Sequence, residues 1–126
     1  MKTHHFLFLG IALFMLMSCK SQEQVSSCEN VTNPRNIPWL AQIIEKGESA
    51  EGAKLTAIER ITYYIESSKT EGFGFAIAYE HVCCDIPYLY YCDCEGNVIT
   101  FYGGIAGCSG ECDITILSRK SIFSTE

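Results

Sequence analysis

A cysteine- and glycine-rich stretch constrains this chain more than any other feature of the sequence. It runs from Cys83 to Cys112 and holds six of the eight cysteines and five of the ten glycines. Glycines in this number oppose a long regular element, because glycine loses more conformational freedom on folding than any other residue. The shape of the stretch must therefore depend on what the cysteines do.

The first residues have the pattern of an export signal. Lys2 precedes a run of twelve residues, Phe6 to Met17, that contains no charged or strongly polar side chain. That is the length of a signal-peptide hydrophobic region, whereas a membrane-spanning helix needs roughly twenty residues. The run ends in Leu16-Met17-Ser18-Cys19, which resembles the lipobox of bacterial lipoproteins. We therefore expect residues 1–18 to be a lipoprotein signal peptide and Cys19 to be lipidated.

Lipidation of Cys19 would also decide where the protein is located. Two or more acyl chains hold a protein stably on a membrane, whereas one chain binds only marginally. Lys20 follows the cysteine, and by resemblance to lipoprotein sorting an aspartate is the residue that often retains such proteins at the inner membrane. We expect an exported protein, anchored through Cys19 in the outer membrane of a Gram-negative bacterium.

The composition excludes some classes of partner. Without Lys2, the expected mature chain has eight basic and fifteen acidic residues, a net charge of −7. An acidic chain without a basic cluster is a poor nucleic-acid binder, because lysine and arginine supply most of that affinity. The same argument disfavours a basic membrane-binding face. We expect no nucleic-acid partner, no cofactor, and a possible envelope protein as partner.

The expected mature chain is long enough for one small domain. The polar composition of residues 19–35 indicates a flexible tether, and residues 118–126 indicate a tail that frays. Between them, residues 36–117 form the expected domain. The segment from Asn36 to Gly47 has an early proline, a late glycine and one apolar stripe, which predicts a short helix with Trp39 in the core.

Alternating apolar residues and turn signals predict strands after the helix. Phe73 to Glu80 places large side chains on one face and small ones on the other, where a helix could approach closely. Short connections favour antiparallel pairing. We expect an α+β fold, in which one N-terminal helix packs on a disulfide-stapled, antiparallel β-meander of four or five strands. The expected strands are Ile58–Glu66, which also fits a helix face, Phe73–Glu80, Tyr88–Asp93 and Val98–Tyr102, with Asp113–Leu117 as a candidate fifth.

Seven cysteines remain once Cys19 is assigned to lipid. An oxidising compartment makes disulfides the default, and the odd count leaves at least one thiol unpaired or paired between molecules. A bond between the neighbours Cys83 and Cys84 would close a strained ring. We expect one of these two to bond to Cys108 or Cys112, tying two loops together. The disulfide candidates are Cys28, Cys83, Cys84, Cys92, Cys94, Cys108 and Cys112.

Metal binding and thiol redox chemistry are the alternatives for these cysteines. Structural zinc sites usually contain Cys-x-x-Cys or Cys/His pairs, and redox pairs use Cys-x-x-Cys at the start of a helix. The sequence contains no Cys-x-x-Cys. A metal-binding or thiol-redox protein that uses the Cys83–Cys112 cluster is therefore the second hypothesis, and we assign no catalytic or metal-binding residue.

The leading hypothesis is a non-catalytic binding or interaction module. Tyrosine-rich strands and glycine loops can present a surface to a partner, and this chain has one of each in the same stretch. The expected binding surface consists of Tyr88, Tyr90, Tyr91, Gly103, Gly104 and Gly107.

Several of these motifs together resemble a family of small, cysteine-rich Gram-negative lipoproteins of unknown function. The resemblance covers most of residues 36–115 and implies a fold type and a location, but no mechanism. Two departures are Thr100, where the family pattern has a cysteine, and Cys108–Glu111, which replaces a more acidic, glycine-rich loop, so the family's disulfides are not carried over. The matching motifs are Cys83-Cys84-Asp85, Asp93-Cys94-Glu95-Gly96-Asn97-Val98-Ile99, Gly103-Gly104-Ile105-Ala106-Gly107 and Cys112-Asp113.

The lipobox generates the first testable prediction. Replacing Cys19 with Ser removes the thiol to which the lipid would be attached, so the protein should be recovered soluble or with its signal uncleaved. Detergent-phase partitioning and N-terminal mass analysis of the wild type and the variant measure this. Recovery of Cys19→Ser as a cleaved, detergent-phase protein would contradict the prediction.

Overall fold

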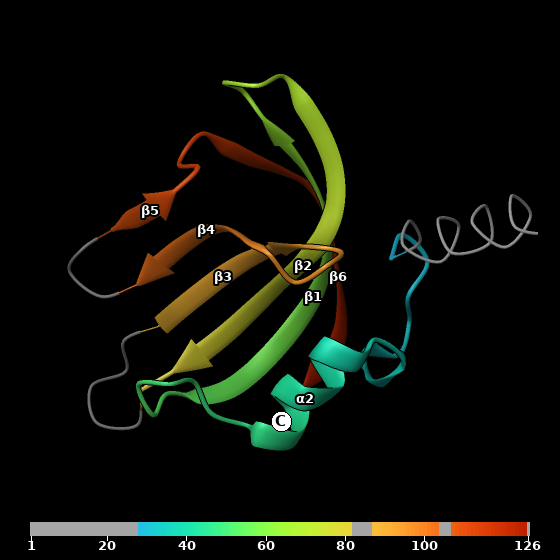
Figure 1. The fold of residues 1–126 in the computed structure, drawn as a ribbon, viewed down its shortest axis with the longest axis vertical. Helices are drawn as coiled ribbons and strands as arrows, with labels where there is room; N and C mark the ends of the chain where they lie inside the picture. The colour runs from blue at the N-terminus through green and yellow to red at the C-terminus, as the bar shows by residue number, and fades with distance from the viewer. Residues whose placement is uncertain (1–27, 82–86, 104–106, 126) are drawn as a thin grey trace, which may run out of the picture.

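Six antiparallel strands form one curved sheet, beside which a short helix packs (Figure 1). The computed structural model describes residues 28–81, 87–103 and 107–125. The strand order in the sheet is β5-β4-β3-β2-β1-β6. The elements are η1 (Pro34–Asn36, a 3-10 turn), α2 (Pro38–Lys46), β1 (Lys54–Ile65), β2 (Thr70–Glu80), β3 (Pro87–Asp93), β4 (Val98–Gly103), β5 (Cys108–Gly110) and β6 (Ile114–Ser124).

The expected layout, a helix packed on four or five strands, is wrong. The structure is mostly a six-stranded antiparallel sheet, and the helix is a short addition to it. The glycine loop contains a strand, β5, and residues 118–124, which were expected to fray, belong to β6. The sequence of β6 lacks the apolar–polar alternation of a strand at its centre, because most residues of this edge strand are exposed to solvent. Its backbone instead satisfies the free edge of β1.

Although the layout differs, helix α2 and the four middle strands, β1 to β4, lie in the parts of the sequence where they are expected. β2 to β4 include the expected segments, and β1 includes all of its expected segment except Glu66, which lies in the following turn. The region from Ile58 is a strand rather than a helix. In α2, Pro38 is the first residue and Gly47 follows the last with φ of 67°. The Gly47 N–H donates to the Ile43 carbonyl oxygen at 2.9 Å, which ends the helix as expected for a left-handed glycine cap.

The sheet is curled, because its two edge strands are neighbours in the sequence. β5 and β6 lie at opposite ends of the strand order, yet only residues 111–113 join them. Such a link spans at most about 14 Å, so the two edges must approach one another. The Glu111 N–H donates to Ile99 on β4, and the Glu66 N–H donates to Asp113, which holds the link at both edges. The result is a partly closed barrel.

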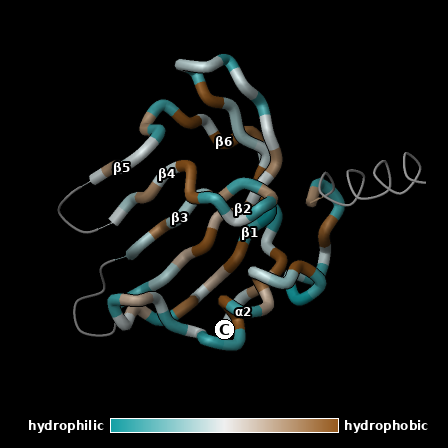
Figure 2. The backbone as a smooth tube through the Cα atoms, in the orientation of Figure 1, coloured by the Kyte–Doolittle hydropathy of each residue, from teal (hydrophilic) through white to brown (hydrophobic). Residues whose placement is uncertain are grey.

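The curl separates an inner face from an outer face, which we call the helix face because α2 covers part of it. Buried residues of the inner face include Ile61, Tyr63 and Tyr91. On the helix face, the fully buried Leu40 and Phe75 belong to a second apolar cluster. Figure 2 shows hydrophobic residues along the middle of β1 and β2 and in α2, whereas the loop after α2 is hydrophilic.

The helix packs against the large-residue face of β2 and not against its small-residue face. The ring of Trp39 meets Phe75 edge-on at 5.7 Å between centroids. The small residues face inward, where the curl brings groups close together. A Cβ on Gly72 would lie 2.6 Å from the Tyr63 hydroxyl oxygen, and one on Gly74 would collide with the Cys92 carbonyl oxygen. The small residues of β2 therefore allow the sheet to curve, and they do not serve as a contact surface for α2.

Two disulfides are present among the described residues, Cys28–Cys94 and Cys108–Cys112. The expected bond from Cys83 or Cys84 to the far cysteines is wrong, because Cys108 and Cys112 bond to each other. The sequence argument missed that the turn after β5 brings them together. Residues 83 and 84 lie outside the described residues.

The disulfide at Cys28 also moves the start of the domain. Cys28 is 3% exposed and belongs to the core cluster under α2. The packed domain therefore begins by Cys28, inside the segment that was expected to be tether. Neither described helix is long and apolar enough to cross a membrane.

The two disulfides differ in the stability that they should contribute. Cys28–Cys94 spans 66 residues of sequence and Cys108–Cys112 spans four. The loop-entropy relation gives about 4 kcal/mol for the first and about 2 kcal/mol for the second. We expect Cys28→Ser/Cys94→Ser to lower the free energy of unfolding more than Cys108→Ser/Cys112→Ser does. Denaturant unfolding of both double variants measures the difference; the reverse order would contradict this account.

Candidate functional site

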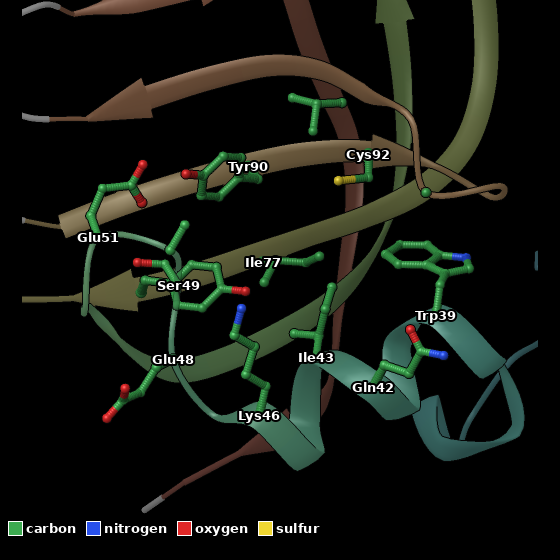
Figure 3. Close-up of a pocket in the computed structure, with 14 residues that line it drawn as sticks. Trp39, Gln42, Ile43, Lys46, Glu48, Ser49, Glu51, Ile77, Tyr90 and Cys92 are labelled. Carbon is green, nitrogen blue, oxygen red and sulfur yellow. The ribbon is translucent and has the colours of Figure 1, made fainter.

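A cleft of about 370 Å³ lies between α2, the loop that follows it and the helix face of β2 to β4 (Figure 3). This volume is within the range of small-molecule sites in proteins. The lining residues are Trp39, Gln42, Ile43, Lys46, Glu48, Ser49, Ala50, Glu51, Ile77, Tyr79, Tyr90, Cys92, Gly96 and Val98.

The cleft has an apolar end and a charged end. Trp39 and Ile43 of α2 face Ile77 and Cys92 of the sheet, and together they form the apolar end (Figure 3). The other end is lined by Lys46, Glu48, Ser49 and Glu51. Of these, Glu51 lies beside Tyr90, whereas the Glu48 carboxylate points away from the sheet (Figure 3). A site of this kind favours an amphipathic occupant.

Helical periodicity explains the wall that α2 contributes. Trp39, Gln42, Ile43 and Lys46 are separated by three, one and three residues, so they share one side of the helix. The Trp39 indole N–H donates to the Cys94 carbonyl oxygen at 3.1 Å, which fixes the ring at the rim of the core. Trp39 is therefore half-buried and contacts the core cluster from its edge.

Local hydrogen bonds hold the loop that forms the charged end. The Ala53 N–H donates to the Ser49 hydroxyl oxygen at 3.1 Å, and the Gly52 N–H donates to the Ser49 carbonyl oxygen at 3.0 Å. An isolated antiparallel bridge joins Glu48 to Lys54. The loop is thus a closed turn, and Glu51 projects from it toward the sheet (Figure 3).

Two tyrosines form the sheet side of the charged end. The rings of Tyr79 and Tyr90 meet edge-on, with 5.7 Å between centroids. Burial raises the pKa of both phenols, and the Glu51 carboxylate contributes a further increase in each pKa. Both hydroxyl groups therefore stay protonated well above neutral pH and remain available as hydrogen-bond donors.

Cys92 is a buried, protonated thiol at the apolar end. It is 3% exposed and is the free cysteine among the described residues. Burial raises the pKa of this thiol to about 12, and the neighbouring Asp93 carboxylate adds to the rise. Because the thiolate is the reactive form, Cys92 acts here as an apolar group and not as a nucleophile.

The expected tyrosine surface is divided between the two faces of the sheet. Tyr90 lines the cleft, and Tyr88 lies on the same face, stacked with Phe101 at 5.9 Å. Tyr91 instead points to the inner face, where it is 5% exposed and contacts Tyr102. Successive residues of a strand point to opposite faces, so Tyr91 could not share a surface with Tyr90.

The expected glycine surface does not line the cleft. Gly103 is the last residue of β4, and a Cβ there would collide with the Tyr88 ring. Its absence of a side chain lets Tyr88 lie against the sheet. Gly107 adopts a φ of 70° with open space around it, and residue 104 lies outside the described residues.

Sequence reasoning missed most of the cleft. Trp39 was expected in the core, and the helix and loop residues around Lys46 and Glu51 were not considered as a site. One signal was available in the sequence, since polar Gln42 and Lys46 continue the helical stripe that Trp39 and Ile43 begin. The approach of the loop to Tyr90 depends on tertiary structure.

Within the described residues, no group of three or more His, Cys, Asp or Glu side chains is arranged to hold a metal ion. The cysteines Cys28, Cys94, Cys108 and Cys112 are cross-linked in pairs. A cross-linked sulfur cannot supply the thiolate that zinc binds. The expected lipidation site, residue 19, lies outside the described residues.

The buried thiol generates a prediction about pH. The pKa of Cys92 rises from about 9 in the unfolded chain to about 12 in the folded protein. Between these two pKa values, the Cys92 thiol loses its proton in the unfolded chain but keeps it in the folded protein. The free energy of unfolding therefore decreases as pH rises through this interval. The free energy of unfolding should fall by up to about 1.4 kcal/mol per pH unit more steeply in the wild type than in Cys92→Ala. Urea unfolding of both proteins from pH 8 to about 11 measures the slopes, and equal slopes would refute the assignment.

Comparisons with known proteins identify no relative of this chain. No family model matches the chain, and no curated protein and no solved structure matches it either. The function must therefore be argued from the cleft and the sequence.

Proposed function

We propose that the protein is an exported, lipid-anchored binding module of the cell envelope and that the cleft beside α2 is its ligand site. The observation that carries this proposal is the division of the cleft into an apolar end and a charged end. Pockets that bury small molecules are mostly apolar and contain a few placed polar groups. The lipid anchor at Cys19 and the outer-membrane location come from the sequence pattern.

The lining indicates which chemistry the ligand has. Trp39, Ile43 and Ile77 offer a flat apolar surface to a ring or a short aliphatic group. At the other end, Lys46 and the phenol of Tyr90 donate hydrogen bonds, whereas Glu51 accepts them. A small amphipathic molecule, with an apolar body and a polar head that both accepts and donates, satisfies both ends. A side chain of an envelope protein with the same chemistry would fit as well.

Binding has more support than catalysis. The thiol of Cys92 and the phenols of Tyr79 and Tyr90 all have raised pKa values, so each is held in its unreactive protonated form. Nucleophilic catalysis needs the opposite, a lowered pKa or an adjacent base. The cleft therefore supplies hydrogen bonds and apolar contact, which are the interactions of a binding site.

The thiol-redox and metal-binding hypothesis has less support. Four described cysteines are cross-linked, and the free one has a pKa of about 12. Metal binding or thiol redox chemistry would then depend on Cys83 and Cys84 without the help of the other cysteines. Elemental analysis of protein refolded with oxidant and without chelator tests this alternative, and stoichiometric zinc would revive it.

An amphipathic fluorescent probe tests the proposed site. Trp39 is the single tryptophan and lines the cleft, so a ligand bound there should change its emission. We expect 8-anilinonaphthalene-1-sulfonate to bind the folded protein, to quench Trp39, and to bind at least tenfold more weakly to Tyr90→Ala. A tenfold loss corresponds to about 1.4 kcal/mol, which removal of a ring contact can supply.

The matched control is Tyr64→Ala, which removes a half-buried tyrosine of β1 that does not line the cleft. It should bind the probe like the wild type. Lys46→Gln should weaken the binding of the anionic probe but not the binding of neutral anilinonaphthalene. Probe binding that is equally lost, or equally kept, in Tyr90→Ala and Tyr64→Ala would contradict the cleft as the site.

A further inference from the structure

The composition disfavours a basic membrane-binding face, but the fold brings cations from two distant strands together at one place. Arg60 on β1 pairs in register with Lys120 on β6, and the next pair along is Ile61 with Arg119. All three cationic residues line a hollow of about 340 Å³ at the middle of the β1–β6 edge. Arg60 and Lys120 share one face of the sheet, whereas the Arg119 guanidinium reaches Tyr91 on the inner face. We call this surface the β6 edge. Its lining residues are Glu29, Asn30, Arg60, Ile61, Thr62, Phe73, Ser118, Arg119 and Lys120.

Two of the three guanidinium and ammonium groups are held in place. Arg119 donates to the Tyr91 hydroxyl oxygen at 2.8 Å and pairs with Glu59 at 3.2 Å. Arg60 donates to the Val31 carbonyl oxygen at 2.9 Å. Glu29 and Glu59 offset part of the charge, which leaves a small positive excess on a chain whose net charge is −6. At the hollow itself, Arg60 and Lys120 exceed Glu29 by one positive charge, because Arg119 is paired with Glu59.

Exposed apolar side chains accompany these cations. Phe73 lines the hollow and is 38% exposed, and Leu117 of β6 is 53% exposed. Basic groups next to exposed apolar groups are the composition of surfaces that bind the headgroup region of anionic membranes.

The N-terminal segment places this edge close to the expected anchor. Glu29 and Asn30 line the hollow, and Val31 accepts the hydrogen bond from Arg60. Figure 1 shows the start of the described chain on the α2 side, away from β4 and β5. Eight residues separate Cys28 from Cys19, and a chain of that length reaches at most about 30 Å. A lipidated Cys19 therefore keeps the β6 edge near the membrane surface.

We propose that the β6 edge docks on the anionic phospholipid surface of the membrane that holds the anchor. This inference rests on the lipid anchor of the proposed function. The anchor raises the local concentration of headgroups, so a weak contact is enough to orient the domain. The cleft lies over β2 to β4, with β1 between it and β6, so docking leaves the ligand site open.

Amide hydrogen exchange of the lipidated, full-length protein on vesicles tests the orientation. We expect residues 114–124 to exchange several-fold more slowly on vesicles that contain phosphatidylglycerol than on phosphatidylcholine alone, and high salt should abolish the difference. The docked population should fall about fivefold for each cation removed. Arg60→Gln/Lys120→Gln tests this, and Lys120→Gln alone keeps the bond from Arg60 to Val31 intact should the double variant be unstable.

The control, Lys54→Gln/Lys69→Gln, removes two cations that do not line the hollow and should keep the protection. Protein that fails to fractionate with either vesicle would contradict the lipid anchor. Protein that fractionates with both but shows equal exchange of residues 114–124 would overturn the docking proposal alone. Equal protection on phosphatidylcholine vesicles after addition of inorganic phosphate would assign the hollow to a free anion, which also overturns it.

Discussion

The short link between β5 and β6 is the constraint on which the rest of the structure depends. Because three residues connect strands at opposite ends of the sheet, the sheet must curl until its edges approach. Curling creates an inner face that only small residues can line at its tightest point, as Gly72 and Gly74 do beneath Tyr63 and Cys92. It also creates an outer face that is left partly uncovered, since α2 is too short to span it.

The candidate site forms on the part of the helix face that α2 does not cover. The disulfide Cys28–Cys94 and the Trp39–Cys94 hydrogen bond hold α2 over one part of the helix face. The sheet continues beyond the helix, and the loop after α2 turns back toward Tyr90. A larger helix would have filled this space with side chains. The protein thus combines a rigid, cross-linked wall with an open cleft, which is an arrangement suited to binding without a large conformational change.

Charge is distributed unevenly over this framework. The cleft contains Glu48 and Glu51 beside one lysine, whereas the β6 edge carries three cations within two paired strands. An edge strand exposes unpaired backbone groups and invites association with other strands, and charged side chains are a common protection against it. Arg119 and Lys120 serve that purpose whatever else they contact. The docking that we propose would give Lys120, beside Arg60 and the N-terminal segment, a second role at the membrane.

The sequence by itself determined the features that depend on local chemistry. Helix α2 follows from Pro38, Gly47 and one apolar stripe, and the middle strands follow from alternation and turn residues. The lipobox is likewise a local pattern, and the lipidation that it predicts stays a prediction. Tertiary structure decided what depends on distant pairing. It placed β6 against β1, joined Cys28 to Cys94, turned Tyr91 inward and brought Glu51 to Tyr90. These contacts arise from the curl of the whole sheet, and no window of sequence contains the information that sets it.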